Sequence, residues 1–166
     1  SLGVPFLIYL DDAWMGGDDK QDCLKNRTIS REVLKKAGFV VSESKAIEPN
    51  HKIVYLGLEV CSLSMKFFIP KKKMEKIIVS AGVMLRQRRV QLRKLASFVG
   101  FVQSCSKALG PVSRLMLRAC YNWMAEVLNV CPSYNIFYPI PDSVREELDF
   151  WRSQIESLQW ISNIPE

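Results

Sequence analysis

A short apolar run that ends in two adjacent carboxylates sets the tightest limit on how the chain can fold. The run covers residues 4–8, and Tyr9-Leu10-Asp11-Asp12 follows it, before Ala13-Trp14-Met15-Gly16-Gly17. Two neighbouring charges are costly to bury unless water, a counter-charge or a cation surrounds them. The paired glycines supply a flexible turn. The sequence therefore predicts a β-hairpin over residues 4–10 and 13–15, with the acidic pair at its exposed tip.

The acidic pair has two interpretations. Asp is common at strand ends, so an ordinary acidic turn explains an isolated Asp-Asp pair. Carboxylate oxygens are also the preferred ligands of hard cations such as Mg²⁺. The Tyr-x-Asp-Asp context, together with the rest of the chain, favours a metal site over a simple turn.

Charge is distributed unevenly along the chain. Residues 62–118 hold thirteen basic side chains and one acid, Glu75, which gives this segment a net charge of +12. The remainder holds ten basic and sixteen acidic side chains, a net charge of −6, so the whole chain carries +6. A basic middle beside an acidic head predicts that a polyanion lies across the middle while a cation occupies the head. A solvated basic helix surface explains the middle segment equally well.

Composition excludes several classes of protein. With 166 residues, 48% apolar and 24% charged, the chain suits one globular domain or two small ones. No apolar run is long enough to span a bilayer, and the start has no secretory leader, so we expect an intracellular protein (cytoplasm or nucleus) with no membrane partner. Five widely spaced cysteines indicate reduced thiols, and a lone histidine, His51, leaves little material for a zinc site or a Ser-His-Asp triad. Because the sequence begins with Ser1 and not with an initiator Met, we expect it to be a piece of a longer protein.

Hydrophobic spacing predicts the α+β class. The first part should contain the hairpin, a helix over residues 19–37 that Gly38 ends, and strands over 39–41, 52–60 and 66–69. Pro70 should open an all-helical part with helices over 71–86, 91–109 and 112–130, a loop over 131–141, and a last helix with the capping box Ser143-x-x-Glu146. The predicted architecture is a small antiparallel sheet with one helix, followed by helices alone.

Four segments in order resemble reverse transcriptases. Tyr9-Leu10-Asp11-Asp12 resembles the Y-x-D-D hairpin of the palm, and Gly38-Phe39-Val40-Val41 through Lys45 resembles the palm motif that follows it. Tyr55-Leu56-Gly57-Leu58-Glu59-Val60 resembles the primer-grip hairpin, and Phe68-Ile69-Pro70 with a basic helix resembles the entry to the thumb. Residues 92–100, Gly110-Pro111 and residues 148–152 are similar to the enzymes of DIRS-like and related retrotransposons.

The resemblance implies a domain order and an activity. Residues 1–69 would be the C-terminal part of the palm, 70–141 a helical thumb, and 142–166 a connection helix leading to a ribonuclease H domain. The parent protein would be an RNA-directed DNA polymerase that extends a primer on an RNA or DNA template with deoxynucleoside triphosphates and two Mg²⁺ ions, Mn²⁺ being an alternative. The family also needs an upstream third aspartate and fingers, so we expect the isolated chain to lack polymerase activity.

The resemblance also assigns roles to residues. Asp11 and Asp12 would be the catalytic metal ligands, and Lys45 would lie near the leaving pyrophosphate, its alternative being a solvated loop lysine. Tyr9, Leu56 and Gly57 would contact the primer; core packing for Tyr9 and a simple bulge for Gly57 are the alternatives. The candidates for contacts to the nucleic-acid backbone are Lys71, Lys72, Lys73, Lys76, Arg86, Arg88, Arg89, Arg93 and Lys94.

Two other functions compete with a polymerase. The chain could be a decayed or domesticated remnant that binds nucleic acid without catalysis. It could also be a structural or protein-interaction module in which the acidic turn is incidental. Metal binding at Asp11 and Asp12 separates the polymerase from both, and salt-dependent binding to a primer–template separates the remnant from the interaction module.

Overall fold

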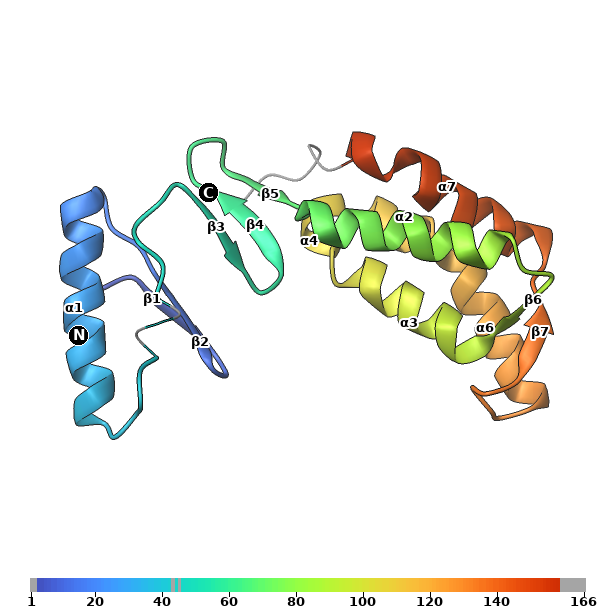
Figure 1. The fold of residues 1–166 in the computed structure, drawn as a ribbon, viewed down its shortest axis with the longest axis horizontal. Helices are drawn as coiled ribbons and strands as arrows, with labels where there is room; N and C mark the ends of the chain where they lie inside the picture. The colour runs from blue at the N-terminus through green and yellow to red at the C-terminus, as the bar shows by residue number, and fades with distance from the viewer. Residues whose placement is uncertain (1–2, 43, 45, 159–166) are drawn as a thin grey trace. The chain divides into compact units, whose positions relative to one another are not determined.

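In a computed structural model of the chain, residues 3–42, 44 and 46–158 are described. The chain divides into two compact units, Ser1–Leu56 and Gly57–Glu166. Together they give an α+β protein with small antiparallel sheets and several helices, as the sequence predicts (Figure 1). Within the described residues, no helix is long and apolar enough to cross a membrane.

The N-terminal unit begins with the predicted hairpin. Strands β1 (Phe6–Tyr9) and β2 (Asp12–Met15) pair antiparallel, with Phe6 opposite Met15 and Tyr9 opposite Asp12. Helix α1 (Lys20–Lys36) follows, and the Asp19 side chain caps it by accepting a hydrogen bond from the Asp22 backbone N–H at 2.8 Å. Gly38, with φ of +88°, ends the helix as predicted.

A buried amide fastens the helix to the hairpin. Asn26 of α1 is 6% exposed, and its Nδ2 donates to the Gly16 carbonyl oxygen just after β2, at 2.9 Å. The backbone of α1 also lies close to Gly17. A Cβ at that position would be 2.6 Å from the Cys23 backbone nitrogen, which is too close for any side chain. Of the predicted glycine pair, Gly17 is therefore needed for the helix to pack close to the hairpin, whereas a Cβ at Gly16 would make only an ordinary contact with Trp14.

The strand predicted at residues 39–41 is wrong. These residues form no regular structure, and Phe39 and Val40 are exposed. A short apolar run becomes a strand only when a neighbour accepts its backbone hydrogen bonds. Among the described residues, no strand pairs with it.

The strand predicted at residues 52–60 is two strands joined by a tight turn. β3 (Lys52–Tyr55) is followed by the two turn residues Leu56 and Gly57, and β4 (Leu58–Cys61) begins directly after them. β4 pairs antiparallel with β5 (Lys66–Phe68), Glu59 lying opposite Phe68, which confirms the predicted partner strand. Gly57 thus lies in a turn and not within a continuous strand.

Two of the three long helices predicted between residues 71 and 130 are broken. α2 (Lys71–Leu85) follows Pro70 as expected, but the second predicted helix becomes α3 (Leu92–Gln103) and α4 (Ser106–Leu109), and the third becomes α5 (Val112–Leu115) and α6 (Arg118–Val130). The first break follows Ser104, whose Oγ donates to the Phe101 carbonyl oxygen at 2.7 Å. At the second, Trp151 Nε1 donates to the Met116 carbonyl oxygen at 2.7 Å. Side chains satisfy backbone oxygens where the helical hydrogen-bond pattern stops.

The predicted loop over residues 131–141 contains a strand. β7 (Phe137–Pro139) pairs antiparallel with β6 (Arg89–Gln91), so that Val90 lies opposite Tyr138. The tryptophan Trp123 makes an edge-to-face contact with Tyr138, with ring centroids 6.4 Å apart. This pairing joins segments far apart in sequence, which local spacing does not reveal.

The last helix is the centre of the C-terminal unit. α7 (Asp142–Leu158) begins one residue before the predicted cap, so Ser143 lies inside its first turn. Val144, Leu148, Trp151 and Ile155 of α7 are fully buried against α2 and α6, as their spacing predicts. Leu58 and Ile69 belong to the same core. The compact units therefore divide after Leu56, while the predicted boundary between palm and thumb after residue 69 stays a prediction.

Candidate functional site

The acidic pair lies where the sequence places it. Leu10 and Asp11 form the turn between β1 and β2, and Asp12 is the first residue of β2. Both aspartates are exposed, and so is Tyr9 at 57% of its surface. Leu10 has φ of +52°, a left-handed conformation that is costly for a side chain without a stabilising local hydrogen bond.

The chemistry of these two side chains suits a hard cation, but only in part. Two consecutive aspartates at a hairpin tip supply the one or two carboxylates through which proteins usually bind Mg²⁺. Among the described residues, however, nowhere do three or more His, Cys, Asp or Glu side chains gather closely enough to hold a metal. Asp11 and Asp12 thus supply part of a donor set, with the remaining ligands to come from water, substrate or other groups.

Lys45, the predicted contact to the leaving pyrophosphate, lies outside the described residues. Its assignment stays a prediction.

The turn at Leu56 and Gly57 has an unusual backbone. Both residues have positive φ, +49° and +76°, as a two-residue type I′ hairpin turn requires. Such a turn favours glycine at its second position, which accounts for the Leu-Gly pair. Both residues are exposed, and the Gly57 carbonyl oxygen accepts a hydrogen bond from Lys73 Nζ at 3.2 Å.

The predicted basic residues fall into two groups. Five of them are exposed, and their side chains make no hydrogen bond, ion pair or ring contact with another described residue. These are Lys71, Lys72, Arg88, Arg89 and Lys94. The other four already have partners. Lys73 and Lys76 lie over the Phe101 ring, Arg86 Nε donates to the Gly82 carbonyl oxygen, and Arg93 Nε donates to Asn135 Oδ1.

A pocket of about 440 Å³ lies between α2 and α3. Lys76, Arg93 and Lys94 give it positive charge, and Phe98 and Phe101 add aromatic surface. Lys76 Nζ stands 4.4 Å from the centre of the Phe101 ring, a cation–π distance. Basic side chains beside aromatic rings can hold a polyanion that also has apolar surface, such as a nucleic acid.

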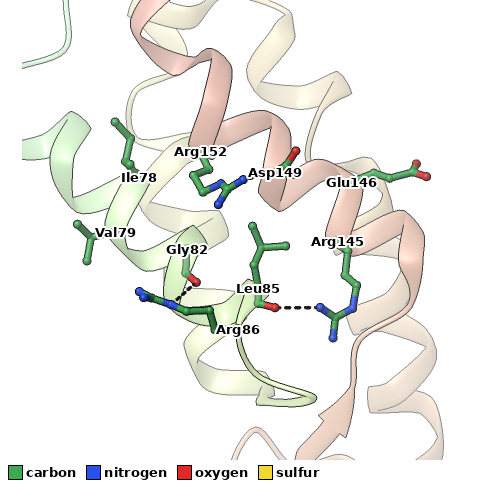
Figure 2. A pocket seen from close by; sticks show the side chains of 9 residues that line it. All are labelled: Ile78, Val79, Gly82, Leu85, Arg86, Arg145, Glu146, Asp149 and Arg152. Carbon is green, nitrogen blue, oxygen red and sulfur yellow. Dashed lines mark hydrogen bonds and ion pairs between the residues drawn. The ribbon is translucent and has the colours of Figure 1, made fainter.

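A second pocket, of about 730 Å³, lies between α2 and α7 (Figure 2). Arg86, Arg145 and Arg152 line it together with Glu146 and Asp149. Arg145 is not available to a ligand there, since its two terminal nitrogens donate to the Leu85 and Gln87 carbonyl oxygens at 3.0 and 3.1 Å. Arg152 pairs with Asp149 at 2.7 Å.

Sequence reasoning missed two charged residues on α7 that hold other helices by their ends. Arg145 closes the C-terminal end of α2, where helix carbonyl groups carry partial negative charge. Glu147, 7% exposed, accepts from the backbone N–H groups of Ala119 and Cys120 in the first turn of α6, at 2.8 and 2.9 Å. The sequence offers one signal for Glu147, since it falls on the apolar face of the predicted helix beside Val144 and Leu148.

The comparisons with known proteins point to a fold and no further. No protein-family model matches the chain, and no curated protein matches it. Among solved structures it is similar to a foamy viral protease–reverse transcriptase in complex with double-stranded DNA, with a TM-score of 0.61 and 15% sequence identity. The match covers 89% of this chain and 24% of that one, so the chain spans about a quarter of its neighbour's length. The chain therefore has a reverse-transcriptase-like fold.

Proposed function

We propose that this chain is part of an RNA-directed DNA polymerase of a retrotransposon, and that it carries the catalytic hairpin, the primer-contacting turn and a nucleic-acid-binding helical unit. The observation that supports this most directly is the exposed Asp11-Asp12 pair at the tip of a two-stranded hairpin, in a chain with a reverse-transcriptase-like fold.

In this proposal Asp11 and Asp12 hold Mg²⁺ at the hairpin tip. When bound, two such ions would stabilise the attacking primer hydroxyl and the leaving pyrophosphate oxygens during nucleotidyl transfer. The hairpin contributes fixed positions, because the β1–β2 pairing leaves only Leu10 and Asp11 outside the strands. Because the described residues offer no third metal ligand nearby, we expect this chain alone to have no polymerase activity.

The C-terminal unit would hold the duplex. The exposed side chains of Lys71, Lys72 and Lys94 are available to phosphate groups, and Arg88 and Arg89 extend the same charge. Contacts of this kind position a duplex without reading its sequence, as a polymerase that copies any template needs. The solved neighbour's complex with double-stranded DNA supports this part of the proposal.

Primer extension tests the polymerase. The protein encoded by the complete open reading frame should be assayed on a primed RNA template with deoxynucleoside triphosphates and Mg²⁺, as wild type, Asp11→Asn and Asp18→Asn. Asp18 is a matched control because it is exposed and lies just beyond the hairpin. We expect Asp11→Asn to abolish extension and Asp18→Asn to leave it unchanged. Equal activity in all three would refute the assignment of the hairpin.

The second candidate function is a nucleic-acid-binding remnant without catalysis. The exposed basic side chains of Lys71, Lys72 and Lys94 favour it, because they would bind a nucleic-acid backbone whether or not the hairpin binds a metal. Extension would then be absent in every variant, while duplex binding would still weaken steeply as salt rises. Lys72→Glu and Lys94→Glu should weaken binding, and Lys36→Glu in α1 serves as the control. Binding that does not change with salt would leave the protein-interaction module.

A further inference from the structure

Lys73 differs from the lysines beside it on α2. Lys71 and Lys72 are exposed, whereas Lys73 is half-buried. Its Nζ donates to the Gly57 carbonyl oxygen at 3.2 Å and lies 5.5 Å from the centre of the Phe101 ring on α3. The ammonium group of Lys73, a residue of α2, thus contacts both the turn and α3.

The geometry at Gly57 depends on the same group. A Cβ added at Gly57 would lie 3.1 Å from Lys73 Nζ, closer than most such contacts, and φ there is +76°. The hydrogen bond fixes the orientation of the peptide unit that joins Gly57 to Leu58. Leu58 is 7% exposed and belongs to the helical core, so the turn is held on both sides of that peptide unit.

The compact division of the chain agrees with this contact. Gly57 is the first residue of the C-terminal unit, and Leu56 is the last residue of the N-terminal unit. Two kinds of contact thus join this segment to the helices. One is the hydrogen bond from Lys73, and the other is the packing of Leu58 and Ile69 in the helical core.

We propose that Lys73 is a positioning residue that holds the Gly57 peptide group of this turn against the helices of its own unit, and that it does not contact phosphate. The proposal rests on the proposed function, in which that turn contacts the primer end. Its consequence is that Gly57, as a primer-contacting residue, keeps its place relative to the helices of the same unit that bind the duplex. Lys72, one residue earlier and exposed, keeps the role of a phosphate contact.

Two measurements on the present chain separate these roles. Lys73→Met removes the ammonium and keeps the length of the side chain, and Lys72→Met is the matched control. Neutralising a phosphate contact lowers the slope of log affinity against log salt by about one. We expect that change for Lys72→Met and an unchanged slope for Lys73→Met. Hydrogen exchange of a peptide that covers the turn should accelerate about fivefold in Lys73→Met only, a change of the size that one net hydrogen bond supplies.

A third measurement reads the effect on catalysis. In primer extension by the complete protein, Lys73→Met should lower kcat and leave the KM for the primer–template unchanged, and Lys73→Arg should restore kcat because a guanidinium can also donate to the Gly57 carbonyl oxygen. Gly57→Ala disturbs the same contact, because the added Cβ would lie 3.1 Å from Lys73 Nζ. Its effect on exchange should be less than additive with that of Lys73→Met.

The outcomes distinguish the two proposals. A slope lowered by one in Lys73→Met, with exchange of the turn unchanged, overturns the positioning role and makes Lys73 a phosphate contact. A wild-type chain whose affinity ignores salt overturns the proposed function instead, and the exchange data then still report on the Lys73–Gly57 hydrogen bond by themselves.

Discussion

Replacing Glu147 with Gln should destabilise the C-terminal unit out of proportion to the size of the change. The carboxylate is 7% exposed, and each of its oxygens accepts one backbone N–H from the first turn of α6. Leu117, the residue before α6, offers no side-chain cap, so Glu147 takes that role from another helix. The Gln side chain keeps one acceptor, but it turns a donor toward the second N–H and removes the negative charge from the helix N-terminus.

The expected loss follows from these two contacts. A hydrogen bond to a charged group contributes about 1.5–3 kcal/mol, and the charge–dipole interaction adds up to about 1 kcal/mol. Losing one bond and the charge should lower the free energy of unfolding by about 2 kcal/mol. For a chain of this size that lowers Tm by roughly 4–8 °C.

Thermal unfolding followed by circular dichroism measures this loss. Glu146→Gln is the matched control, because Glu146 is exposed on the same helix turn, and surface changes of this kind stay within about 0.5 kcal/mol. Hydrogen exchange should also accelerate at the Ala119 and Cys120 amides in Glu147→Gln. If the two variants unfold at the same temperature, Glu147 does not cap α6.

Two further predictions concern a strained turn and the buried thiols. Met65 has φ of +50°, so Met65→Gly should raise Tm by a few degrees, because relieving about 1–2 kcal/mol of left-handed strain outweighs the entropy that glycine adds, while Ser64→Gly should lower it. A fall in Tm for Met65→Gly would contradict this. Burial raises the pKa of the Cys105 and Cys120 thiols, and the Glu147 carboxylate adds to the effect at Cys120. Above pH about 8.5 the unfolded chain therefore binds fewer protons than the folded chain, and urea denaturation should show the free energy of unfolding falling as pH rises. A free energy that stays constant up to about pH 10 would contradict the burial of these thiols.

Local pattern was enough to predict the parts of the fold that depend on neighbours in sequence. The hairpin, the helix that Gly38 ends, and the buried positions of α7 all follow from turn residues and from apolar spacing. The breaks at Ser104 and Met116 did not follow, because the second depends on Trp151, 35 residues away. The pairing of β6 with β7 was missed for the same reason, and the apolar run after Gly38 was taken for a strand because its spacing carries no information about a partner.

The candidate site was predicted unevenly for a related reason. Asp11 lies in an exposed turn and Asp12 at the exposed start of β2, and their neighbours in sequence determine this hairpin. The basic residues were chosen by charge alone, and charge does not tell an exposed lysine such as Lys72 from Lys73, whose ammonium already has an acceptor. Arg145 and Glu147 escaped notice because their partners are backbone groups of other helices.

The position of α7 in the sequence has a consequence for synthesis of the protein. Arg145 closes the end of α2 and Glu147 caps the start of α6, yet both residues follow those helices along the chain. During translation, the end of α2 and much of its apolar face therefore stay uncovered until α7 has been synthesised, after more than half of the unit. A chain that stopped before α7 would leave α2 without its main packing partner and the first turn of α6 without its cap, and its exposed apolar surface would make it a substrate for chaperones and proteases.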